Sequence, residues 1–151
     1  MNARAAEPYE AGLTLMNTLY GGQAGEQMIE AMKDICPDFA NMTIEWALGG
    51  VMARPGLDLK TRELLLVASC VTLANAAPQL RAHMSSALKL GASKVEVVET
   101  ILQMLFYAGG PAVSGALVLA SEVFKTFDSA VQASRSESVS MSRSTPGSST
   151  S

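Results

Sequence analysis

Residues 53–110 read ARPGLDLKTRELLLVASCVTLANAAPQLRAHMSSALKLGASKVEVVETILQMLFYAGG, and this stretch decides the fold. Its apolar residues recur at the spacing of amphipathic helices, and prolines and glycines separate one apolar run from the next. Neither this stretch nor its flanks show the alternation of polar and apolar residues that is typical of strands. The sequence therefore predicts an all-α protein.

Turn and cap residues divide this stretch into three predicted helices, over residues 58–76, 78–90 and 93–108. Asp58 can cap the first helix, and Pro78 suits the first turn of the second. Ser93 and Glu96 have the spacing of a capping box at the start of the third. The flanking sequence predicts further helices over residues 8–20, 23–35, 38–52 and 111–131. The helix over 58–76 is apolar nearly all round, so we expect it to be central.

The chain has 151 residues, which suits one domain. We expect this helical domain to span residues 1–128. Residues 129–151 are rich in serine and poor in apolar residues, so they bury little to offset an ordering cost of about 1–2 kcal/mol per residue. They are predicted to form a disordered tail, either inert or with a regulatory or targeting role.

Charge and composition exclude several classes of partner. A net charge of -3 offers no basic field for nucleic acid or an anionic membrane surface. The beginning of the chain lacks an apolar signal core and no apolar run is long enough to span a membrane, so we expect a soluble cytoplasmic protein. Because 48% of residues are hydrophobic and only 17% are charged, we also expect subunit interfaces.

The chain is poor in metal-ligating residues. Cys36 and Cys70 lie far apart without CxxC spacing, and Cys70 falls in an apolar run typical of a buried, inert thiol. One histidine and no nearby cluster of carboxylates give no recognisable ligand set. We therefore expect neither a metal centre nor a thiol redox pair.

His83 is the one histidine and the main candidate for proton transfer, because an imidazole exchanges protons near neutral pH. It lies at the border of the apolar face of the predicted helix 78–90. It could line the lip of a cleft, or it could be a structural histidine bonded to a backbone carbonyl.

A polar stripe on the next helix could complete a site around this histidine. Glu96, Glu99, Gln103 and Tyr107 recur at spacings of three and four residues, so they share one face. That face could orient the imidazole, or it could be solvated, with Glu96 occupied in the capping box.

Two arginines flank the turn before the predicted central helix. Arg54 and Arg62 could hold a substrate carboxylate through paired hydrogen bonds. They could equally pair with Asp58, Glu63 or an acidic residue of a neighbouring subunit.

The chain from about residue 9 to residue 124 resembles the carboxymuconolactone decarboxylase family, and three segments carry the most specific part of the resemblance. They are the ARPGLD turn followed by Arg62, the helix L-x-x-H-x-x-x-A-L-x-x-G around His83, and the segment E-x-x-L-Q-x-x-x-Y-x-G-x-P. The resemblance implies an all-helical fold built round a helical hairpin, which assembles into trimers or hexamers with sites near subunit interfaces. It also implies that His83 is the active-site histidine, that Arg54 is the arginine of the turn motif, and that Glu99 and Gln103 belong to the helix that follows.

The sequence departs from this family at two kinds of position. The CxxC pair of the related alkylhydroperoxidase-type proteins is missing, which disfavours peroxidase chemistry. Gly50 stands where the decarboxylase motif W-G-E-[VI]-W has its acid, and Met52 stands at its second aromatic position. A substrate other than the family's own lactone, such as a secondary-metabolite intermediate, is therefore equally compatible with the sequence.

Our leading hypothesis is a cofactor-free lyase or isomerase that acts on a small unsaturated lactone or oxo acid. In it, His83 transfers the proton, Glu99 orients the imidazole, and Arg54 or Arg62, with Gln103 and Tyr107, binds the substrate. The alternative is a catalytically silent family member that serves as an oligomeric binding or scaffold protein. Loss of the acid at Gly50 motivates this alternative.

Overall fold

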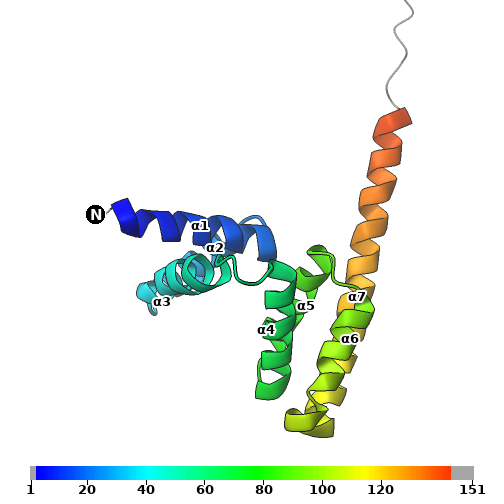
Figure 1. Cartoon of the computed structure of the whole chain (residues 1–151). Coiled ribbons are helices and arrows are strands. Elements are labelled where there is room, and N and C mark those ends of the chain that lie inside the picture. The colour runs from blue at the N-terminus through cyan, green and yellow to red at the C-terminus, as the bar shows by residue number, and fades with distance from the viewer. Residues whose placement is uncertain (1–2, 144–151) are drawn as a thin grey trace, which may run out of the picture.

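The computed structural model describes residues 3–143, and side chains from residue 7 to residue 137. Its helices are α1 (Ala3–Tyr20), α2 (Ala24–Met32), α3 (Pro37–Met42), the π-helix η1 (Thr43–Met52), α4 (Leu59–Leu73), α5 (Ala77–Lys89), α6 (Lys94–Gln103) and α7 (Leu105–Arg143) (Figure 1). The described range contains no strand, so the prediction of an all-α protein is confirmed. No helix within this range is both long and apolar enough to cross a membrane.

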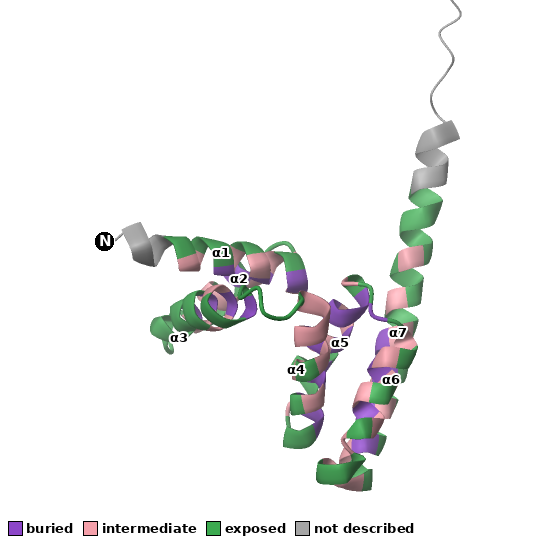
Figure 2. Cartoon of the chain, viewed as in Figure 1, coloured by how far each residue is buried: buried purple, intermediate pink, exposed green. Residues whose placement is uncertain are grey.

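The helices form two groups, each with its own apolar core. In Figure 1, α1, α2 and α3 lie to one side of α4, while α5, α6 and α7 lie on its other side. The first core joins α1 to η1 around Leu19 and Ile44, and the second lies where α4, α5, α6 and the first half of α7 meet, around Val67, Met84 and Ile101. Figure 2 shows the buried residues concentrated in these two places. Helices α4 and α5 therefore stand at the junction of the two groups.

The predicted caps are present. The Asp58 carboxylate accepts a hydrogen bond from the Thr61 amide at 2.9 Å and begins α4. Ser93 and Glu96 form both bonds of a capping box at the start of α6. Gly91, with φ +91°, lies just beyond α5, in a backbone conformation that other residues rarely adopt. Local sequence therefore sets where α4 and α6 begin and where α5 ends.

Helix α4, which the sequence predicted to be central, lies between the two helix groups, but it keeps an exposed apolar face in the single chain. Val67 and Val71 are buried, whereas Leu65 and Leu73 on the opposite face are mostly exposed. A helix that is apolar all round needs a neighbour on each face, and the chain supplies neighbours for one face only.

The predicted helix over 38–52 is two elements, because its second part winds as a π-helix. Ala53 donates its amide to the carbonyl of Leu48, five residues earlier, at the end of η1. This wider turn is rare and is often found at functional sites.

The last helix is longer than the predicted 111–131. Gly109, with φ 76°, bends the chain just before Pro111, and α7 then continues to Arg143, away from the other helices (Figure 1). In this extension, the hydroxyls of Ser129 and Ser134 donate to the backbone carbonyls of Lys125 and Ala130, one helical turn earlier. Such local hydrogen bonds do not depend on packing against an apolar core. Residues 144–151 of the predicted tail lie outside the described residues. The division into a domain over 1–128 and a tail stays a prediction.

Two glycines allow α1 and η1 to cross at close range. A Cβ atom on Gly49 would lie 1.9 Å from the carbonyl oxygen of Pro8, and one on Gly12 would lie 2.0 Å from that of Ile44. Real Cβ atoms do not approach backbone this closely, and backbone cannot move aside as a flexible side chain can. The crossing therefore requires glycine at both positions.

We predict that Gly49→Ala lowers the free energy of unfolding by roughly 1–3 kcal/mol, the usual cost of an overpacked core. The measurement is thermal or urea unfolding. Gly50→Ala is the matched control, because a Cβ there would lie 3.5 Å from the Glu45 carbonyl, an ordinary contact. Equal stability of the Gly49→Ala protein and the control would contradict the close crossing.

Candidate active site

A buried contact between a carboxylate and an imidazole joins α4 to α5. Glu63 is fully buried on α4, and its Oε2 lies 2.8 Å from Nδ1 of His83 on α5. The Glu63, Val67 and Cys70 side chains share the buried face of α4, which places the carboxylate against α5. A carboxylate away from water requires hydrogen-bond donors, and Nδ1 of His83 lies within hydrogen-bond distance of it.

Tyr20, the last residue of α1, supplies the second donor. Its hydroxyl donates to Oε1 of Glu63 at 2.8 Å and lies 3.3 Å from Nδ1 of His83. The tyrosine and imidazole rings meet edge to face, with centroids 5.6 Å apart. Burial, and then the adjacent carboxylate, raises the pKa of Tyr20, so the hydroxyl keeps its proton.

The imidazole also forms part of the wall of an apolar pocket of about 440 Å³ between the two helix groups. The pocket is lined by Met16, Tyr20, Met28, Thr43, Trp46, Ala47, Leu48, Val51, Met52, Leu66, Gln79, Ala82 and His83. Because Nδ1 of His83 faces Glu63, Nε2 is the ring nitrogen left for a bound molecule. Glu63 itself does not line the pocket, so a substrate would meet the imidazole and not the carboxylate.

The sequence pattern of the carboxymuconolactone decarboxylase family matches residues 37–122, a range that contains both Glu63 and His83. The chain is also 35% identical over 117 residues to 4-carboxymuconolactone decarboxylase of Acinetobacter baylyi, which covers 78% of this chain and 87% of that protein. The chain belongs to the carboxymuconolactone decarboxylase family.

Two further relatives match most of this family member. An uncharacterized 15.0 kDa protein of Paracoccus denitrificans is 40% identical over 102 residues, which are 66% of this chain and 75% of that protein. Nitrosuccinic acid decarboxylase of Metarhizium robertsii is 26% identical over 111 residues, which are 74% of this chain and 77% of that protein. The two relatives that are named as decarboxylases therefore have names that specify different substrates.

The predicted stripe on α6 does not reach His83 within this decarboxylase-family chain. Glu99 and Gln103 are exposed, and Tyr107, at the start of α7, is 90% exposed. Among the described residues, no hydrogen bond or ion pair joins these three side chains to the imidazole, whose partners are Glu63 and Tyr20. Within the chain, Glu63 occupies the place beside Nδ1 that the sequence assigned to Glu99.

Arg54 lies in the turn before α4 and Arg62 in the first turn of α4, and neither lines the His83 pocket. Arg62 donates to the backbone carbonyls of Arg54, at 2.9 Å, and Leu57, at 3.2 Å, so its guanidinium holds the turn together. Arg54 lines a different and more open cavity, together with Asp58. A role for either arginine in binding substrate stays a prediction.

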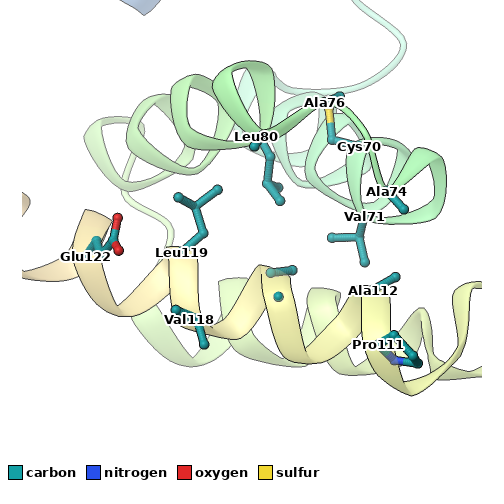
Figure 3. Close-up of a pocket in the computed structure, with 13 residues that line it drawn as sticks. Cys70, Val71, Ala74, Ala76, Leu80, Pro111, Ala112, Val118, Leu119 and Glu122 are labelled. Carbon is teal, nitrogen blue, oxygen red and sulfur yellow. The ribbon is translucent and has the colours of Figure 1, made fainter.

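A second apolar groove, of about 310 Å³, lies between α7 and the pair α4 and α5 (Figure 3). Cys70, Leu80 and Leu119 contribute to its walls, and Glu122 lies at one end, where it is paired with Arg81 at 2.7 Å. Burial, and then the Glu63 carboxylate, raises the pKa of Cys70. The thiol therefore stays protonated and is a poor nucleophile, which agrees with the predicted inert cysteine.

The sequence analysis missed Glu63 and Tyr20 as members of the site. Glu63 entered only as a possible partner for Arg54 or Arg62, and Tyr20 only as the end of the predicted helix 8–20. A usable signal was present: Glu63 precedes Val67 and Cys70 by four and seven residues, so it falls on the apolar face of its helix. A charged residue on such a face requires a buried partner.

The described residues contain no group of three or more histidine, cysteine, aspartate or glutamate side chains that could hold a metal ion. The groups close to His83 are instead one carboxylate and one phenol. This donor set can bind, release and relay protons.

Glu96 links the start of α6 to α4 and gives a prediction for stability against pH. Its carboxylate accepts from Lys60 at 2.8 Å and from the Ser93 amide at 2.7 Å, and these bonds lower its pKa to about 2. Because the folded pKa is below the ordinary value of 4.5, the stabilisation is complete above pH 4.5 and is lost as the pH falls towards 2.

We predict that the melting temperature falls less steeply between pH 4.5 and pH 2 in Glu96→Gln than in the unchanged protein, because the variant lacks this titrating group. Glu99→Gln is the matched control, since Glu99 lies one turn further along α6 and is exposed. Identical slopes for Glu96→Gln and the unchanged protein would show that the bonds to Lys60 and Ser93 do not stabilise α6.

Proposed function

We propose that this protein is a cofactor-free, decarboxylase-like lyase, in which His83 transfers a proton to a small acid bound in the apolar pocket. The observation that carries the proposal is the Glu63–His83 pair at the pocket wall: a buried carboxylate holds Nδ1, and the imidazole itself lines the pocket. An imidazole held in this way can take up a proton as imidazolium beside the carboxylate and then release it.

The names of the relatives support an acid that carries its own electron sink. One name specifies a carboxymuconolactone, which has a lactone carbonyl, and another specifies nitrosuccinic acid, which has a nitro group. When the bond to the carboxylate carbon breaks, carbon dioxide leaves and the electron pair moves into that carbonyl or nitro group. Nε2 of His83 then transfers a proton to the carbon in place of the lost carboxylate, and solvent restores the proton on the ring.

The apolar lining of the pocket favours this step, because it offers the reacting carboxylate fewer hydrogen bonds than water does. Most of its lining residues are apolar, and loss of carbon dioxide from a carboxylate is easier where water does not solvate the charge. Trp46 is 71% exposed at the pocket and Val51 is half-exposed, so both can contact a bound ring. A small unsaturated lactone, oxo acid or nitro acid is compatible with a pocket of about 440 Å³ and a mostly apolar lining.

Exposed apolar side chains support the predicted homo-trimer or homo-hexamer. They come from both helix groups and include Ile35, Met42, Trp46, Leu73, Val95, Phe106 and Tyr107. Covering such side chains against further copies of the chain would remove them from water. In an assembly of this kind, Arg54, Glu99, Gln103 or Tyr107 of a neighbouring copy could still contribute to a pocket.

The catalytically silent alternative rests on Gly50. This glycine stands where the family motif has an acid, so the chain lacks a carboxylate at that position. Gly50 also does not line the His83 pocket. Binding of both acids without release of carbon dioxide would favour this alternative.

We predict that His83→Gln lowers the rate of carbon dioxide release by at least about 100-fold, because the general acid is lost. The assay supplies purified protein with 4-carboxymuconolactone and, separately, with nitrosuccinic acid. Glu63→Gln should also lower kcat, since a neutral amide cannot stabilise imidazolium. Glu30→Gln is the matched control for that change, because Glu30 is exposed on α2 and pairs only with Lys33 among the described ion pairs. Full activity of a folded His83→Gln protein would reject the proposal.

A further inference from the structure

The hydroxyl of Tyr20 has one proton and two possible acceptors. It lies 2.8 Å from Oε1 of Glu63 and 3.3 Å from Nδ1 of His83. The shorter distance and the negative charge both assign the proton to the bond with Glu63. The phenol does not lose this proton at working pH, because burial raises its pKa.

This assignment fixes the role of Nδ1 in His83. The neighbours of Nδ1 are Oε2 of Glu63, at 2.8 Å, and the oxygen of Tyr20. Both act as acceptors once the tyrosine proton points to Oε1, so Nδ1 must carry a hydrogen and donate it. The ring nitrogen that gains and loses a proton is then Nε2.

The assignment depends on Glu63 remaining ionised. If Glu63 were protonated, it could donate its hydrogen to Nδ1, and the imidazole would then carry its own hydrogen on Nε2. The carboxylic acid and the imidazole would both be neutral in this arrangement, which we call the neutral pair. Each donor to the carboxylate favours the ionised form over this neutral pair. Tyr20 is a donor to Glu63 in either form of the pair, whereas His83 donates only when Glu63 is ionised. The negative charge of Glu63 also raises the pKa of the nearby Cys70 thiol, with which it shares no described hydrogen bond.

We propose that Tyr20 is a positioning residue for the reaction at His83. By donating to Glu63 it keeps the carboxyl group ionised, which keeps Nδ1 of His83 protonated and leaves Nε2 to carry the proton to the substrate. Only the last step rests on the proposed lyase function. Tyr20 lies on α1, outside the range 37–122 that matches the family pattern, so this contribution comes from a part of the chain that the family match does not cover.

The test is nitrogen-15 NMR of the imidazole ring across pH, combined with Tyr20→Phe. Because the chain has one histidine, each ring nitrogen gives one signal without further assignment of residues. In the unchanged protein, Nδ1 is expected to bear a hydrogen at every pH and only Nε2 to titrate. In Tyr20→Phe, the neutral pair becomes populated, so Nδ1 loses its hydrogen and Nε2 holds one.

The same variant is expected to lower kcat about 10- to 100-fold, the range for losing a hydrogen bond to a charged group, with a smaller change in KM. Tyr9→Phe is the matched control, since Tyr9 lies on the same helix, is half-buried and packs against the apolar core beside η1. The control is expected to leave both the NMR signals and kcat unchanged.

Two results would overturn the proposal. One is a neutral ring in the unchanged protein with its hydrogen on Nε2, which decides the matter even if Tyr20→Phe does not fold. The other is a Tyr20→Phe protein whose ring nitrogens and kcat match those of the unchanged protein. If the NMR result is as expected but the unchanged protein releases no carbon dioxide from either acid, the lyase function is rejected and the assignment of the two nitrogens is supported.

Discussion

The buried carboxylate of Glu63 is the constraint on which the site depends. A carboxylate that leaves water loses several kcal/mol of hydration, and each hydrogen bond from a partner returns about 1.5–3 kcal/mol. Glu63 has two such bonds, from Tyr20 at the end of α1 and from His83 on α5. The three helices α1, α4 and α5 must therefore assemble together before the charge is satisfied.

This requirement connects the packing of the N-terminal helices to the chemistry. The position of Tyr20 depends on how α1 crosses η1, and that crossing depends on the missing side chains of Gly12 and Gly49. The π-helix η1 also supplies Trp46, Leu48 and several other side chains of the pocket. The first helix group thus gives the site its apolar wall and one hydrogen-bond donor, while α4 and α5 give the acid and the imidazole.

Local sequence was sufficient for the all-helical class, for the starts of α4 and α6 and for the end of α5, because caps and helix-ending glycines act over a few residues. Asp58 and the Ser93–Glu96 pair show this, and His83 could be selected because it is the one histidine. Local sequence did not predict the π-helix over 43–52, the end of α6 at Gln103 or the length of α7. The partners of His83 could not be selected in this way. Tyr20 is 43 residues from Glu63 and 63 from His83, so the contacts exist only after the two helix groups meet. Family motifs directed attention to Arg54 and Glu99, which lie at the surface of the single chain.

The most direct test of the account is the position of a bound acid in a crystal structure of the His83→Gln protein, soaked with 4-carboxymuconolactone. The account predicts the acid in the pocket walled by Trp46, Met52 and Leu66, with its reacting carbon beside residue 83. An acid bound instead in the groove beside Cys70, or in the cavity beside Arg54, would contradict it.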